Sequence, residues 1–207
     1  MPERKTVTRG RPPATSAEQV SGVALDLFAR RGFDETTMDD VAAALGVGRR
    51  TVFRYFPSKN DLVWGDFDAV LRRLEGELRA ADARAPLAVA LRDAVVASNT
   101  YPADVLPELR LRLTLIQTVP ALQAHSMLRY AEWRQVVARF AARRLRRDPY
   151  HLVPQAIGYN ALAASTSAFA HWVRNPDKDL LKLLRRSYDL LAAGLDEGEL
   201  KRLARGI

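Results

Sequence analysis

The sequence contains no cysteine among its 207 residues. This absence excludes disulfides, thiolate metal sites and cysteine nucleophiles, and it fits a reducing compartment such as the cytoplasm. The first 14 residues include charged side chains and Pro12-Pro13 but no apolar run. They are therefore not a secretory signal.

No segment alternates apolar and polar residues as a half-buried strand does, and no internal repeat is present. Helical periodicity and proline or glycine stops predict an all-α fold. The predicted helices are 16–31, 37–45, 48–55, 58–80, 86–98, 105–118, 120–146, 154–173, 177–195 and a short one near 197–204. The helix from Ser58 to about Ala80 would be about 33 Å long, enough to link two domains.

The segment 154–173 carries no formal charge and is long enough to raise the question of a membrane span. Six polar side chains would be costly in hydrocarbon, and the segment has no excess of leucine and isoleucine. Its many small residues instead favour a helix packed closely against neighbours.

Positive charge exceeds negative charge, with a formal net charge of +8 and a pI near 10.2. The surplus gathers in the first 14 residues and between Arg49 and Lys59, where no acid occurs. Such a distribution suits a polyanionic partner. Residues 1–14 are expected to form a flexible basic arm, either a minor-groove arm or a merely solvated tail.

The stretch from Thr36 to Leu62 predicts a helix, a glycine turn and a short cationic helix. Thr37 and Asp40 form a predicted capping box, and Met38 and Val41 begin a buried stripe. Gly46 suits the positive φ that often follows a helix end. This arrangement predicts a helix-turn-helix unit that reads DNA.

The cationic helix from Gly48 to Tyr55 presents guanidinium groups and hydroxyls, while Val52 and Phe56 anchor its opposite face. Forked arginine donors match guanine edges in the major groove. Ser58 and Asp61 form a second predicted capping box. Lys59 opposes the dipole of the helix that follows, so a phosphate partner would explain its position.

The run GVGRRTVFRYFPSKNDL, residues 46–62, resembles the DNA-binding segment of the TetR family of one-component bacterial repressors. The stretches 64–68 and 119–144 further resemble the transcriptional regulators of the mycofactocin system. These resemblances imply a homodimeric repressor that binds a pseudo-palindromic operator and has a C-terminal region that binds a small-molecule effector.

The resemblance also implies roles for individual residues. Arg49, Arg50 and Arg54 are expected to reach base edges, with Gly48 and Thr51 allowing or assisting close approach. Thr37, Tyr55 and Lys59 are expected to hold phosphates. Phe53 stands where the family usually has tyrosine, so a methyl or sugar contact replaces a hydroxyl contact to phosphate.

The C-terminal region is expected to hold the effector pocket and the dimer interface. Apolar residues on the predicted helices are candidates for the pocket: Trp64, Phe67, Leu109, Leu113, Ile116, Met127, Tyr130, Trp133 and Val137. Each could instead be ordinary core. Residues of the last two long helices are candidates for a four-helix dimer interface: Tyr159, Ala163, Phe169, Leu184, Tyr188 and Leu191. The alternative is an ordinary monomer core.

Five arginines cluster where the helix from Pro120 ends: Arg139, Arg143, Arg144, Arg146 and Arg147. Favourable charge at a helix C-terminus is one explanation, and an anion site for phosphate groups is the other. The mycofactocin-regulator resemblance implies a long-chain acyl-coenzyme A effector, whose tail would need an apolar pocket and whose phosphates would need a basic rim.

No catalytic, metal or cofactor site is expected. The three histidines are scattered, and no GxSxG elbow or phosphate-loop pattern occurs. Two alternatives to an effector-controlled regulator are an architectural DNA-binding protein without effector and an unrecognised hydrolase or lipid-binding enzyme. The expected domains are the arm, 1–14, the helix-turn-helix domain, 15–60, and the effector and dimerisation domain, 61–207.

Overall fold

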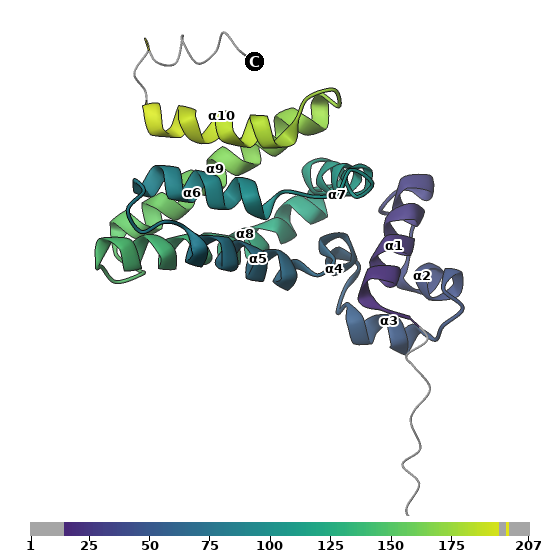
Figure 1. Ribbon diagram of the computed structural model, residues 1–207. Helices are drawn as coiled ribbons and strands as arrows, with labels where there is room; N and C mark the ends of the chain where they lie inside the picture. Colours follow the sequence, from purple (N-terminus) through teal and green to yellow (C-terminus); the bar gives the residue numbers. More distant parts are fainter. Residues whose placement is uncertain (1–14, 195–197, 199–207) are drawn as a thin grey trace, which may run out of the picture. The chain divides into compact units, whose positions relative to one another are not determined.

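The computed structural model describes residues 15–194 and Gly198 and shows helices without any strand over this part of the chain (Figure 1). The predicted arm at 1–14 and, apart from Gly198, the predicted helix near 197–204 lie outside the described residues. The all-α prediction is confirmed. Two compact units divide between Gly65 and Asp66.

Over residues 15–65, the N-terminal unit contains four helices, α1 Ala17–Arg31, α2 Met38–Ala44, α3 Arg49–Tyr55 and α4 Lys59–Trp64. Three of them, α1, α2 and α4, begin at a side-chain cap. Ser16 and Gln19 form a capping box at α1, and Thr37 and Asp40 form the predicted box at α2. Gly46 has the expected positive φ, 63°, in the turn that precedes α3.

The core of this unit joins its helices through large apolar side chains. Val20 and Phe28 of α1, Val41 of α2, Val52 of α3 and Leu62 of α4 are all at most 2% exposed. The hydroxyl of Ser21 donates a buried 2.8 Å hydrogen bond to the carbonyl of Leu62, which ties α1 to α4. The orientation of α3 is therefore fixed by packing on its inner face.

The predicted continuous helix from Ser58 to about Ala80 is wrong. Gly65 ends α4 with φ 58°, and α5, Phe67–Ala80, begins immediately afterwards. Asp66 caps α5 by accepting a 2.8 Å hydrogen bond from the amide of Ala69. A glycine that takes positive φ and a capping aspartate break the helix, although apolar periodicity continues across the break.

This break places the boundary between the two compact units a few residues beyond the expected one at 60/61. Because α4 packs on α1, it belongs to the N-terminal unit. The 14 residues of α5 correspond to about 21 Å, so neither helix alone has the length of the expected link.

Over residues 66–194, the C-terminal unit contains six helices. They are α5, α6 Leu87–Ser98, α7 Leu106–Thr118, α8 Pro120–Leu145, α9 Leu152–Arg174 and α10 Leu180–Ala193. The longest, α8 and α9, pack on each other, and α10 lies against α9 and α6 (Figure 1). Gly158 allows close approach of α9 to α8, because a Cβ there would lie 2.9 Å from the carbonyl oxygen of Arg134.

The interior of this unit is built from small and large apolar side chains of five helices. Val95 of α6, Val137 of α8, Ala161 of α9 and Leu184 of α10 are fully buried in one cluster. The small residues of α9 thus pack against neighbouring helices, as their abundance predicted. Over residues 15–194, no helix is long and apolar enough to span a membrane.

Candidate nucleic-acid interface and ligand cavities

Helix α3 presents its cationic side chains outward and its apolar side chains inward. Arg49, Arg50 and Arg54 are exposed, whereas Val52 and Phe56 are 0% and 4% exposed. The predicted anchoring by Val52 and Phe56 is confirmed. The helix therefore has one face fixed to its unit and one face of exposed guanidinium groups, which can donate to base edges and phosphates.

Arg49 is held loosely by neighbours within the unit. Its guanidinium lies 3.2 Å from the carboxylate of Asp39 and 5.2 Å from the centre of the Phe53 ring. Both members of the ion pair are more than 60% exposed. Exposed ion pairs contribute about 0–1 kcal/mol, so Arg49 can exchange Asp39 for another acceptor at little cost.

Arg54 and Tyr55 form a connected pair at the other end of α3. The Arg54 guanidinium stacks 5.0 Å from the Tyr55 ring centre and donates to its hydroxyl at 3.3 Å. The Tyr55 hydroxyl donates a 2.7 Å hydrogen bond to the carbonyl of Thr15. Tyr55 is half-buried, and its hydroxyl joins α3 to the residue that precedes the cap of α1.

The other two residues expected to hold phosphates, Thr37 and Lys59, also have polar partners within the unit. The Thr37 hydroxyl accepts from the amide of Asp40 and donates to its carboxylate at 2.5 Å. The Lys59 ammonium donates to the carbonyls of Phe33 at 2.9 Å and Asp34 at 3.4 Å, and lies 4.3 Å from the centre of the Phe33 ring. These contacts explain why a lysine lies in the first turn of α4, against the helix dipole, without a phosphate partner.

The remaining candidates differ in exposure. Phe53 is 37% exposed, which is unusual for a large aromatic side chain and suits an apolar contact with another molecule. Thr51 is half-buried. Gly48 caps α3 with an ordinary φ of −71°, and apart from its immediate neighbours in sequence no atom of the described residues lies within 4 Å of where its Cβ would be. Nothing in this unit requires glycine at that position.

A cavity of about 660 Å³ opens on α7, α8 and α9 and gathers residues from two of the predicted sets. Three expected effector residues line it, namely Leu113, Ile116 and Tyr130. Three expected dimer residues also line it, namely Tyr159, Ala163 and Phe169. Burial raises the pKa of Tyr130, which keeps its phenol neutral over a wide pH range.

Other residues expected in an effector pocket do not line this cavity. Met127 is 63% exposed on α8. Val137 is fully buried in the core, and Leu109 and Trp133 pack against that core. Phe67 is buried at the start of α5, and Trp64 is buried in α4 of the N-terminal unit. Helical periodicity identified apolar positions here but did not separate cavity lining from packing.

Two residues expected at a dimer interface belong to the monomer core. Leu184 is fully buried, and Tyr188 is 4% exposed. The Tyr188 hydroxyl hydrogen-bonds to the Ser165 hydroxyl at 3.0 Å and to the carbonyl of Ala161 at 3.1 Å. Both side chains lie on the face of α10 that packs on α9. By contrast, Tyr159, Ala163 and Leu191 are exposed.

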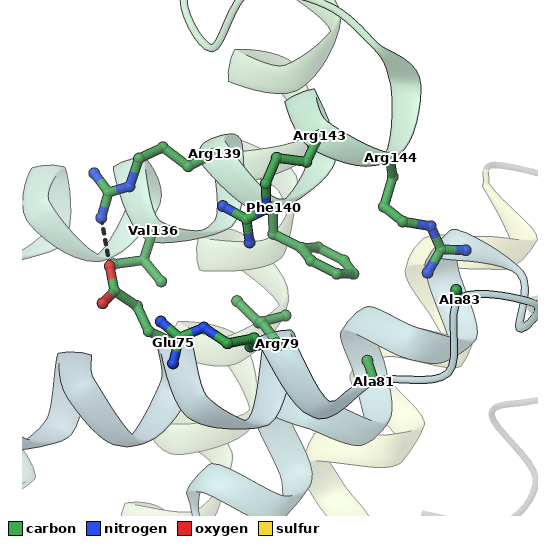
Figure 2. A pocket seen from close by; sticks show the side chains of 10 residues that line it. Glu75, Arg79, Ala81, Ala83, Val136, Arg139, Phe140, Arg143 and Arg144 are labelled. Atoms are coloured by element: carbon green, nitrogen blue, oxygen red, sulfur yellow. Dashed lines mark hydrogen bonds and ion pairs between the residues drawn. The ribbon is translucent and has the colours of Figure 1, made fainter.

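A second cavity, of about 450 Å³, lies between α5 and the last turns of α8 (Figure 2). Three arginines of the predicted cluster line it, Arg139, Arg143 and Arg144, whereas Arg146 and Arg147 do not. Sequence reasoning missed its other charged residues, Glu75 and Arg79. They are 60 or more positions away along the chain, and only the packing of α5 on α8 brings them together.

Family models match both units. The N-terminal model, described as bacterial regulatory proteins of the tetR family, matches residues 22–63. The model described as the MftR C-terminal domain matches residues 85–196. The family resemblance seen in the sequence is therefore confirmed in both parts of the chain.

Full-length comparisons agree with these matches. The chain is 41% identical over 196 residues to MftR of Mycobacterium tuberculosis, which is named as a mycofactocin biosynthesis transcriptional regulator; the match covers 95% of this chain and 98% of the relative. A 66-residue stretch, 32% of each chain, is 36% identical to the HTH-type transcriptional regulator LuxR of Vibrio harveyi.

Solved structures show the same fold at lower identity. The repressor FadR of Thermus thermophilus, solved with lauroyl-CoA, is 24% identical with a TM-score of 0.59, covering 87% of this chain and 95% of its own. SmeT, repressor of a multidrug efflux pump of Stenotrophomonas maltophilia, is 19% identical with a TM-score of 0.59, covering 89% and 93%. The chain belongs to the TetR family of bacterial transcriptional regulators and carries the C-terminal domain of MftR.

Proposed function

We propose that this chain is a homodimeric repressor that binds a pseudo-palindromic operator and leaves it when a small hydrophobic effector binds the C-terminal unit. The DNA-binding part of this proposal rests on the geometry of α3. Arg49, Arg50 and Arg54 are exposed on a short helix whose opposite face is fully buried. Such a helix can enter the major groove without rearranging its own unit.

Base reading by Arg49 is tested with the operator selected from random duplexes and with Arg49→Ala. The variant should lose about 1–3 kcal/mol of preference at one base position, because a bidentate arginine contact to guanine is lost. Arg30→Ala is the control, since Arg30 is 73% exposed on α1 and pairs only with Asp26 among described residues. Equal losses in both variants would contradict the assignment.

The same experiment separates a repressor from an effector-independent architectural protein. A repressor should bind its operator at least about 1,000-fold more tightly than non-specific duplex at the same salt concentration. An architectural protein should show a small ratio with a steep salt dependence. A ratio near one for every selected sequence would refute the repressor.

Dimerisation is proposed through the exposed face of α9. Tyr159 is 55% exposed, Ala163 lies one turn further along, and Leu191 of α10 is 37% exposed. Ala163→Arg should yield monomers in sedimentation without loss of folding, because position 163 is exposed within one copy. Leu128→Arg is the control, since Leu128 is 65% exposed on α8 and should leave the dimer intact. A wild-type monomer would refute this part.

The effector is proposed to occupy the 660 Å³ cavity, and a long-chain acyl-coenzyme A is our candidate. The apolar residues in the mixed lining of this cavity, among them Leu113, Ile116 and Phe169, suit an alkyl chain, and the similar fold of FadR was solved with lauroyl-CoA. A second copy on the exposed face of α9 would cover the cavity, because Tyr159 and Ala163 belong to both surfaces.

Release is proposed to follow from a change in the separation of the two α3 helices. Half-sites lie about 34–36 Å apart, so a shift of a few ångström would forfeit simultaneous contacts. The experiment titrates an operator complex with acyl-coenzyme A species of increasing chain length. Leu113→Gln should weaken release, whereas Leu109→Gln, one turn earlier on α7 and outside the cavity, should not. No release by any of these compounds, while another ligand acts, would exclude the candidate.

A further inference from the structure

The 450 Å³ cavity between α5 and α8 combines an apolar floor with a strongly basic rim (Figure 2). Leu78, Val136 and Phe140 form the floor and are each at most 4% exposed. The rim carries four arginines and one glutamate: Glu75, Arg79, Arg139, Arg143 and Arg144. Its formal charge of +3 is concentrated on a volume within the range of about 300–1,000 Å³ that is typical of small-molecule sites.

Two of the four arginines have partners within the unit. Arg139 donates to the Glu75 carboxylate at 2.7 Å, and Figure 2 shows this pair at one end of the cavity. Arg144 donates to the carbonyls of Asp82 at 3.2 Å and Ala85 at 2.5 Å. These two arginines hold α5 and the loop after it against α8, so their positions are explained by the fold.

The other two arginines have no such explanation. Both side chains are exposed, and neither Arg79 nor Arg143 has a side-chain hydrogen bond or ion pair with any described residue. In Figure 2, Arg143 extends from α8 toward α5, where Arg79 lies. Favourable charge at a helix C-terminus would account for either arginine alone. It does not account for two cations from separate helices that face the same cavity, because like charges repel each other.

We propose that this cavity binds the diphosphate group of a nucleotide-type ligand, with Arg79 and Arg143 as its direct partners. Guanidinium forks pair bidentately with phosphate oxygens, and two forks on opposite walls can hold two adjacent phosphates. The apolar floor beside them accommodates an uncharged part of the same molecule. Glu75 neutralises Arg139 and so limits the negative charge that the site can bind.

Coenzyme A and free nucleotides share this diphosphate chemistry. If the diphosphate belongs to an acyl-coenzyme A, this cavity binds the polar head group of the effector proposed above, and that link rests on the proposed function. Binding of the diphosphate itself does not require DNA or an acyl chain. The two proposals can therefore fail independently.

The test is calorimetric titration of the full-length protein, without DNA and at fixed ionic strength, with pyrophosphate, ADP and coenzyme A. Arg79→Gln and Arg143→Gln should each weaken pyrophosphate binding about tenfold, the loss expected for one charged hydrogen-bonding partner. Arg147→Gln is the matched control, because Arg147 lies beside the same helix end but outside the cavity. Arg147→Gln should bind pyrophosphate with the same affinity as the wild type.

Glu75→Gln supplies a gain of binding that a damaged fold could not produce. Removing the carboxylate releases Arg139 and raises the charge of the rim, so pyrophosphate should bind a few-fold more tightly. The proposal is overturned if Arg79→Gln and Arg143→Gln bind like the wild type, or if Arg147→Gln loses as much affinity as they do. Absence of binding by all three probes at millimolar concentration also overturns it.

The three probes identify the source of the diphosphate. Tighter binding of coenzyme A than of ADP assigns the site to a coenzyme A head group, and equal binding assigns it to free nucleotides. Titration of the operator complex with an acyl-coenzyme A, in the wild type and in Arg143→Gln, then measures the effect on release. Diphosphate binding without any effect on release would support the site and refute its link to the effector.

Discussion

Lys59 allows a sharp test, because the sequence and the structure give its ammonium group different partners. The sequence predicts a phosphate contact. In the structure, the ammonium donates to the carbonyls of Phe33 and Asp34 and lies 4.3 Å from the Phe33 ring centre. These carbonyls belong to the segment that joins α1 to α2. We therefore expect Lys59→Met, which keeps the apolar stem, to destabilise the N-terminal unit.

The size of the effect follows from the contacts that are lost. A hydrogen bond to a charged group contributes about 1.5–3 kcal/mol, and a partly exposed cation–π contact about 0.5–1 kcal/mol. Because Lys59 is half-buried, we take a combined loss of about 2 kcal/mol near the lower end of these ranges. That loss corresponds to about a 30-fold increase in the opening equilibrium of the unit.

Hydrogen exchange measured on peptides from α1, α2 and their connecting segment reads this opening directly. Exchange there should accelerate about 30-fold in Lys59→Met, while peptides of α8 and α9 stay unchanged. Operator affinity at 25 °C should fall modestly, with an unaltered salt slope. Unchanged exchange, together with a salt slope reduced by about one, would refute this reasoning and assign the ammonium to a phosphate.

Three further predictions concern stability. Gly158→Ala should lower the free energy of unfolding by about 1–3 kcal/mol, because the added Cβ meets the carbonyl of Arg134. The control Gly76→Ala, whose Cβ would meet nothing within 4 Å, should raise it by up to about 1 kcal/mol, and equal shifts of the two variants in chemical denaturation would contradict this. Tyr188→Phe should cost about 1–2 kcal/mol through its lost buried hydrogen bonds yet leave the dimer intact in sedimentation, and dissociation would show that the residue reaches the interface. The Thr37 side-chain hydrogen bond lowers the pKa of Asp40, so the contribution of this carboxylate to folding stability should be complete above about pH 4 and be lost as the pH falls further. Thr37→Val should remove this pH dependence from the acid unfolding curve, and an unchanged curve would refute the prediction.

Local patterns determined much of this protein. Capping residues and apolar spacing located α1, α2 and α3 of the N-terminal unit, because these signals act within a few residues of chain. The positive φ of Gly46 and the inward positions of Val52 and Phe56 were predictable for the same reason. The family was also recognisable, since its motif is a contiguous segment of the N-terminal unit.

Helix breaks and the burial of an apolar stripe could not be predicted from helical periodicity. The helix break at Gly65 was missed because the apolar stripe continues through it, and a single backbone angle decides the outcome. On α10, spacing identified an apolar stripe that includes Leu184 and Tyr188. Only the packing of α10 on α9 showed that these two side chains fill the monomer core.

The sequence by itself determined where most helices form, which end of the chain carries the helix-turn-helix and which segments are basic, because those properties follow from neighbours along the chain. Tertiary structure alone decided that Arg79 and Arg143 line the same cavity and that Lys59 reaches the carbonyl of Phe33. The members of these two pairs are 64 and 26 positions apart along the chain. Helix packing, which depends on the shapes of many side chains at once, is what brings them together.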